Sequence, residues 1–205
     1  MIDARKVSAI AVLAAALLAP SVRAQSAANP DPAAVQAGTY ALETRHARIL
    51  FAVSHLGFST WYGDFSGATG SLTLDPKHPA ADVLEVSIPV ATVSTTNATL
   101  DGELKSAVWF DAAKFPTITF KSTKVTVTGR TTAKVAGDLS FHGVTRPVVL
   151  AVAFKASGVN PLTKAFTVGF EVKGRLKRSQ FGVATDLPLI GDDVDLVISA
   201  PFEKK

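Results

Sequence analysis

The chain has 205 residues, no cysteine, and 21 Lys and Arg against 17 Asp and Glu, which gives a net charge of +4. The absence of Cys excludes disulfides, thiolate metal ligands and cysteine nucleophiles. Basic and acidic residues are interleaved except in one cluster, 173–178, which is most simply a solvated strand end. A nucleic-acid partner, which needs a concentrated basic face, is therefore not expected.

Residues 1–24 have the pattern of a secretory signal peptide. Arg5 and Lys6 precede an apolar run, and a small-residue cleavage pattern ends at Ala24. The run is too short to span a bilayer, which takes about 20 apolar residues. We therefore expect cleavage after Ala24 and a periplasmic location. The next residues, 25–38, are rich in Ala, Pro, Asn and Asp and indicate a disordered lead-in to a single domain at 39–205.

Within 39–205 the apolar residues mostly recur with a period of two, which is typical of strands with one apolar face. The alternation is clearest in 166–173 and 194–202. Turn-forming residues separate the segments, among them the run from His142 to Pro147. The other strands are expected at 40–43, 49–55, 62–74, 82–90, 117–128, 135–141 and 148–155.

The segment 97–106 departs from this pattern. Leu100 and Leu104 are four residues apart and Asn97 stands at the N-cap position, so one short helix is expected there. Strands in regular order with Gly and Pro between them suggest a sandwich or an up-and-down barrel. A barrel is favoured because closure removes exposed strand edges. The fold class is therefore all-β, an antiparallel eight-stranded β-barrel with one short helical segment.

Few residues offer chemistry. The sequence contains no nucleophile elbow, phosphate-binding glycine loop or His-Glu metal helix, and its four His are most simply structural, so no catalytic or metal site is expected. Asp138 lies inside an apolar strand, where a buried charge needs a partner. Arg175 or Arg178 could supply an ion pair; the alternative is an enzyme that uses His55 or Asp138 as a general base.

Four blocks of the chain resemble the YceI-like polyisoprenoid-binding family, and they occur in the order that the family has. The blocks are 40–65, 101–111 followed by 115–120, 137–147, and 178–182. The resemblance covers essentially the whole of 39–205. It implies a lipocalin-like barrel, secreted to the periplasm, that encloses a long amphipathic lipid such as a polyprenyl diphosphate, a quinone or a fatty-acid derivative.

An eight-stranded barrel is just wide enough to be packed solid or to hold one small ligand. The second case predicts a lipid-binding protein without catalytic activity or cofactor. We expect contacts with the lipid tail from seven apolar residues, Phe51, Val53, Phe65, Leu104, Trp109, Phe110 and Phe120, and contacts with its head group from His55, Arg178 and Ser179. The first case leaves a solid-cored interaction or stress protein. Transient membrane contact and a homodimer through outward apolar residues such as Leu50 and Val197 also remain open.

Overall fold

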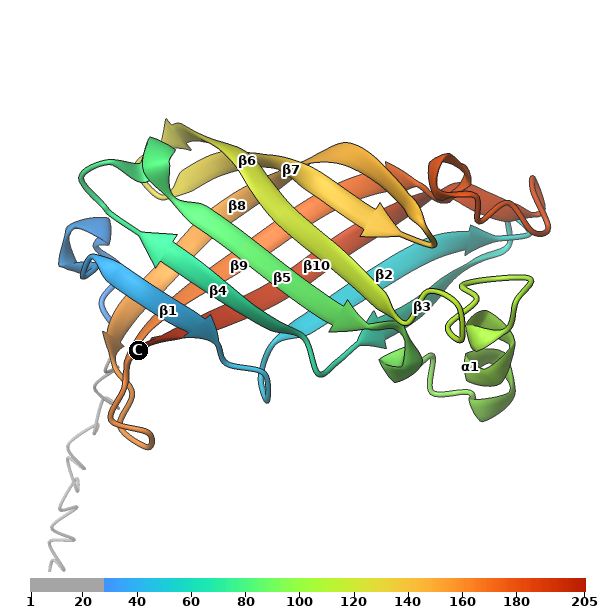
Figure 1. Ribbon diagram of the computed structural model, residues 1–205, viewed down its shortest axis with the longest axis horizontal. Helices are drawn as coiled ribbons and strands as arrows, with labels where there is room; N and C mark the ends of the chain where they lie inside the picture. The colour runs from blue at the N-terminus through green and yellow to red at the C-terminus, as the bar shows by residue number, and fades with distance from the viewer. Residues whose placement is uncertain (1–27) are drawn as a thin grey trace, which may run out of the picture.

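The wall of the molecule is one antiparallel sheet of ten strands, as the computed structural model shows for residues 28–205, the part of the chain that it describes (Figure 1). The signal peptide expected at 1–24 lies outside these residues. The strands are β1 (Gly38–Leu42), β2 (Arg48–His55), β3 (Ser59–Phe65), β4 (Thr69–Leu74), β5 (Val83–Pro89), β6 (Thr117–Gly129), β7 (Thr132–Phe141), β8 (Val144–Val159), β9 (Phe166–Lys177) and β10 (Ile190–Lys204).

The sheet closes into a barrel because β1 pairs with both β4 and β10. The C-terminal part of the long strand β10 pairs with β1, where Phe202 lies opposite Leu42. The N-terminal part of β10 pairs with β2, where Leu196 lies opposite Phe51. β1 and β2 therefore share one position in the ring, and β3 and β4 share the next. Within residues 28–205 the result is a closed antiparallel barrel with eight strand positions, which confirms the expected fold class.

The single strand expected at 62–74 is wrong, because the chain breaks between β3 and β4. Gly67 has a φ of 67°, and the Thr92 hydroxyl donates to the Ser66 carbonyl at 2.8 Å and accepts from the Ser66 N–H at 3.3 Å. Ala68 is buried at the same point. At this break a side chain from another segment therefore takes up the backbone hydrogen bonds of Ser66, which period-two patterning cannot detect.

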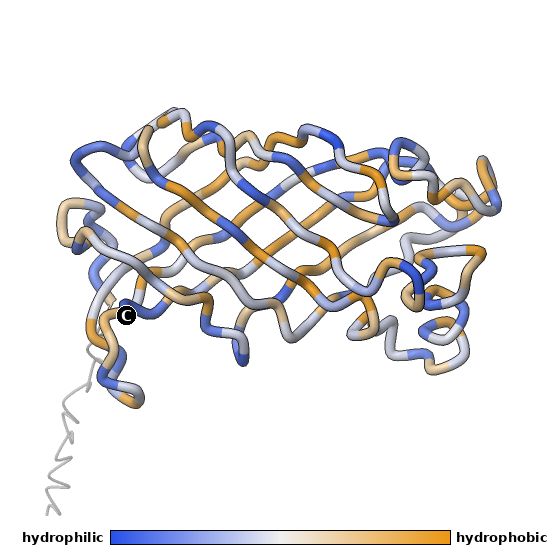
Figure 2. Tube along the Cα trace, in the orientation of Figure 1, coloured by the Kyte–Doolittle hydropathy of each residue, from blue (hydrophilic) through white to orange (hydrophobic). Residues whose placement is uncertain are grey.

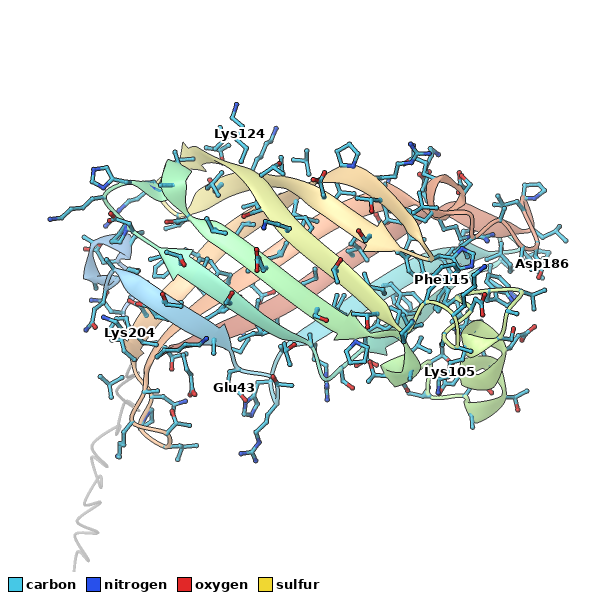
Figure 3. The ribbon with its side chains drawn as sticks, in the orientation of Figure 1. Glu43, Lys105, Phe115, Lys124, Asp186 and Lys204 are labelled. Atoms are coloured by element: carbon cyan, nitrogen blue, oxygen red, sulfur yellow. The ribbon has the colours of Figure 1, made fainter. Side chains whose placement is uncertain are left out.

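Inward and outward side chains alternate along the strands. In β5, Leu84, Val86 and Ile88 line the interior, whereas Glu85 is exposed. The alternation of orange and blue along the tube in Figure 2 follows from this period. A bulge after Ser122 in β6 shifts the period by one residue, so that Val125 and Val127 line the interior. Lys124, beside the bulge, points away from the barrel (Figure 3).

The turn between β7 and β8 is shorter than the expected 142–147. His142 and Gly143 both have positive φ, 51° and 76°, which is typical of a two-residue hairpin turn. Val144 already belongs to β8 and lies opposite Phe141, and Pro147 pairs in register with Asp138. The composition of this segment therefore overstated the turn.

The expected helix is α1 (Ala98–Lys105), at one end of the barrel (Figure 1). The Asn97 side chain accepts hydrogen bonds from the N–H groups of Thr99 and Leu100 at 3.1 and 3.2 Å, as an N-cap does. Leu104 is buried and Leu100 packs against the same apolar cluster. That cluster fills this end of the barrel and contains Ile49, Phe65, Ala68, Ile88, Val90, Val93, Leu104, Trp109, Ile118 and Val183.

Residues 28–37 cross the opposite end of the barrel as an N-terminal strap (Figure 1). Asn29 exchanges two backbone hydrogen bonds with Ser157 of β8, at 2.7 and 2.8 Å. A short 3-10 helix, η1 (Pro32–Ala34), follows, and Asp31 pairs with Arg130 at 3.1 Å. The described part of the segment 25–38 thus differs from the disordered lead-in that its composition predicts.

Candidate ligand-binding cavity

A cavity of about 730 Å³ runs inside the barrel and is lined almost throughout by apolar side chains. This volume is within the usual range for small-molecule sites. All seven residues expected to contact a lipid tail line it, namely Phe51, Val53, Phe65, Leu104, Trp109, Phe110 and Phe120. The sequence therefore identified part of the lining, whereas contact with a lipid stays a prediction.

Aromatic rings cross the barrel near α1. Phe65 lies 5.7 Å from Phe51 and 6.1 Å from Phe110, and Phe141 lies 5.3 Å from Phe110, measured between ring centroids. Gly63 permits this packing, because a Cβ at that position would come within 2.3 Å of the Phe51 ring. Together with the buried cluster around Leu104, these rings close this end, which we call the blind end.

Arg178, the first residue of the 3-10 helix η4 (Arg178–Phe181), lines the blind end and is only 5% exposed. Its guanidinium group stacks on Trp109 with 5.4 Å to the ring centroid. Burial lowers the pKa of this guanidinium, although the group stays charged as arginines do in proteins. Four hydrogen bonds of 2.7–3.0 Å tie it to backbone carbonyls, those of Val183, Thr185, Ile190 and Gly191.

The other two head-group candidates are placed differently. The N–H and hydroxyl of Ser179 both donate to Asp192 at 2.9 Å, and these contacts help to lower the pKa of the Asp192 carboxyl against the opposing effect of burial. His55 packs against Trp61, with 5.4 Å between ring centroids. The residues that line the cavity include neither Ser179 nor His55. Of the three, the structure brings only Arg178 to the cavity.

The end opposite α1, which we call the mouth, opens to solvent beside the N-terminal strap. Val127 lines the cavity and is nevertheless 56% exposed, and the turn after it, 129–132, also belongs to the lining. The N-terminal strap contributes Asp31 and Pro32, and the loop between β4 and β5 contributes Asp82. Polar and charged groups therefore gather where the cavity meets solvent. Lys204 marks this end in Figure 3, whereas Lys105 and Asp186 mark the blind end.

Asp82 is the strongly perturbed carboxyl group of the mouth. It follows the 3-10 helix η2 (Pro79–Ala81), and its Oδ1 accepts the N–H of Asp75 at 2.7 Å. Burial raises the pKa of its carboxyl from 3.8 to about 6, and the nearby charge of Asp75 raises the pKa further against the hydrogen bond. Ionised Asp82 is thus held in surroundings that favour its neutral form.

The substitution Asp82→Asn is expected to stabilise the protein at neutral pH. The pKa of the Asp82 carboxyl is 3.8 in the unfolded chain and about 6 in the folded one, so at pH values between these two the folded state binds more protons. The free energy of unfolding of the wild type therefore falls as the pH rises through this range. The Asn variant has no ionisable group at this position and so lacks this pH-dependent loss. Because Asp82 is partly exposed, we expect the variant to gain only about 1 kcal/mol in the free energy of unfolding above about pH 7. Urea unfolding of the wild type and the variant across this pH range measures the gain. A gain at about pH 4 as large as that above about pH 7 would contradict its assignment to the shifted pKa of Asp82.

The expectation of a buried ion pair at Asp138 is wrong. Asp138 is exposed on the outer wall, opposite Pro147. Arg175 instead pairs with Asp195 at 2.6 Å, and Arg178 bonds to carbonyls. Among residues 28–205, no group of three or more His, Asp or Glu residues is placed to hold a metal ion. The same residues contain no helix that is long and apolar enough to cross a membrane.

Sequence reasoning missed the residues of the mouth. Asp82 and Arg130 stand beside turn residues, and such polar residues are ordinary in any turn. The turn after β6, the loop before β5 and the N-terminal strap meet around one opening only because the sheet closes into a barrel. One signal was available, because Asp82 continues the inward period of Leu84, Val86 and Ile88.

Comparison with known proteins places the chain in a family. Residues 40–202 match the model of the YceI-like domain. A UPF0312 protein of Azotobacter vinelandii and Protein YceI of Escherichia coli O157:H7 are each 40% identical over 157 residues, which cover 77% of this chain and 81% of each relative.

Solved structures agree with this assignment. A Campylobacter jejuni YCEI protein has 29% identity and a TM-score of 0.66 over 74% of this chain and 90% of that one. Burkholderia cenocepacia BcnA (21% identity, TM-score 0.71, 78% of this chain, 98% of that one) shares the fold. So does a polyisoprenoid binding domain from Saccharophagus degradans (14% identity, TM-score 0.62, 83% and 100%). The chain therefore belongs to the YceI-like domain family.

Proposed function

We propose that this protein is a periplasmic carrier that encloses the tail of a long-chain amphipathic lipid in its barrel. The observation that carries the proposal is the apolar cavity of about 730 Å³ with one blind end and one mouth. A tail that enters at the mouth exchanges water for apolar side chains along its whole length. The polyisoprenoid binding domain that shares this fold supports an isoprenoid as the first candidate class, with quinones and fatty-acid derivatives after it.

Burial of hydrocarbon supplies a free energy of the same size as the cost of association. Each buried CH₂ contributes about 0.8 kcal/mol, so ten buried carbons contribute about 8 kcal/mol, within the range of about 4–15 kcal/mol that association costs. An ion pair is not needed for such binding. The seven tail candidates, which line the cavity from β2, β3, β6 and the α1 region, are the proposed tail contacts.

The proposed partners follow from the exposed surface. Leu50 and Val197 lie opposite each other in neighbouring strands and are each nearly half exposed, so they form a small apolar patch on the outer wall. This patch is the proposed contact of a homodimer. Transfer of a lipid to or from the barrel also implies transient contact with a membrane.

Native mass spectrometry of the purified protein, followed by organic extraction, tests the proposal. We expect one long-chain isoprenoid, quinone or acyl lipid per barrel, released by solvent and identified by its mass. Protein freed of lipid should also take up an added lipid of the same class. Bare protein that refuses polyprenyl, quinone and fatty-acid ligands alike would overturn the carrier and leave a barrel with another role.

A further inference from the structure

We propose, on the basis of the carrier function above, that the mouth selects a lipid with an uncharged polar end, such as a long-chain isoprenoid alcohol. Asp82 is the residue that sets this preference. A carboxylate or diphosphate at the same position is disfavoured. The proposal rests on where the Asp82 carboxyl lies, which of its atoms is free, and which charges surround it.

Asp82 faces the cavity. It precedes β5, in which Leu84, Val86 and Ile88 line the interior and the alternate residue Glu85 is exposed. Side chains two residues apart in an extended chain point to the same side, so Asp82 continues the inward series at the mouth. The cavity lining indeed includes Asp82.

One oxygen of the Asp82 carboxyl is available to a ligand. Oδ1 accepts the Asp75 N–H at 2.7 Å. Within residues 28–205, Oδ2 has no hydrogen bond or ion pair. A carboxylate oxygen accepts hydrogen bonds and, when ionised, donates none. A ligand hydroxyl that reaches the mouth can therefore donate to Oδ2, whereas a carboxylate or a fully ionised diphosphate has no proton to offer.

The charges at the mouth also oppose an anion. In the described chain the cation that lines the mouth is Arg130, and Asp31 already pairs with it at 3.1 Å. Lys204 lies at the same end but does not line the cavity, and its ammonium group donates to the Gln36 side chain at 3.0 Å. Asp75 adds a further negative charge beside Asp82, although it also accepts from His78 at 2.9 Å. A second anion placed next to Asp82 meets like charge in partly buried surroundings, where screening by water is weak.

The polar end belongs at the mouth rather than at the blind end. Arg178 is the cation at the blind end, and four of its donors are bonded to carbonyls. Buried Leu104, Trp109 and Val183 separate that end from solvent. A head group placed there would lose its hydrogen bonds to water and find no protein groups to replace them. The tail is therefore the part that enters first.

Paired ligands with one tail and two head groups test this preference. Displacement of the neutral fluorescent probe N-phenyl-1-naphthylamine is measured with farnesol and with farnesyl diphosphate, below the concentrations at which either aggregates. We expect wild-type protein to bind farnesol at least about tenfold more tightly, as like-charge repulsion at the mouth requires. Asp82→Asn should reduce the difference to about threefold or less, because the amide can donate to phosphate.

Glu85→Gln is the matched control. It removes one negative charge from β5, the strand that Asp82 precedes, but on the outer face, where Glu85 pairs with Lys121 at 2.8 Å. The control should keep the wild-type preference. Equal affinities in the wild type, or an undiminished preference in Asp82→Asn, overturn the inference. Failure of the probe and of both ligands to bind would instead overturn the carrier function itself.

Discussion

Replacement of Arg178 with Met is expected to lower the free energy of unfolding by about 3–5 kcal/mol, a large part of the about 5–15 kcal/mol typical of a domain. Met keeps much of the apolar stem, so the loss comes from the guanidinium group. Its removal leaves four carbonyls without their donor, those of Val183, Thr185, Ile190 and Gly191. Buried acceptors without partners are costly, and the loop that they belong to closes the blind end.

Urea unfolding followed by circular dichroism measures this effect, and Arg175→Met is the matched control. Arg175 is an exposed residue of β9 whose partner is Asp195, so its loss should cost less than about 1 kcal/mol. Arg178→Lys should recover little, because one ammonium group cannot reach four carbonyls in the geometry of a planar guanidinium. Equal losses for Arg178→Met and Arg175→Met would show that the carbonyl contacts add no stability.

The barrel wall could be predicted from the sequence because its signal is local. Alternation in 166–173 and 194–202 depends only on neighbouring residues, and the structure has β9 and β10 there. The signal for the helix was equally local, since it consisted of Asn97 at the N-cap and Leu104 on the buried side. The break after β3 was not predictable, since it depends on a hydrogen bond from Thr92, which is distant in the chain.

The site was predicted in part for the same reason. Large apolar residues at inward positions, such as Phe51 and Phe120, line the cavity because the strand period fixes their side. The charged residues had no such guide. Asp138 was expected to be buried and is exposed. Arg178 is buried, and its hydrogen bonds to backbone carbonyls were not predicted. Which of these two charged residues is buried depends on how the closed barrel brings distant segments together. No local pattern in the sequence indicates this.

Substitution of Ala133 with Trp is expected to abolish most lipid binding without unfolding the barrel. Ala133 in β7 pairs with Val127 and Val152, and all three line the cavity near the mouth. An indole ring there occupies space that the proposed tail needs. Because it enters a void rather than a packed core, the cost of overpacking is small and apolar burial offsets it. Titration with N-phenyl-1-naphthylamine should show affinity at least about tenfold below wild type.

The outward residue of the same strand provides the control for this prediction. Ala136 pairs with Lys124 and Val149, and Val149 is 58% exposed, so the side chain of Ala136→Trp lies on the outer wall. This variant should bind the probe as wild type does and should copurify with the same lipid. If Ala133→Trp also keeps full binding, the ligand does not occupy the interior. In that case the apolar cavity would no longer support the carrier function, whatever lipid the protein retains.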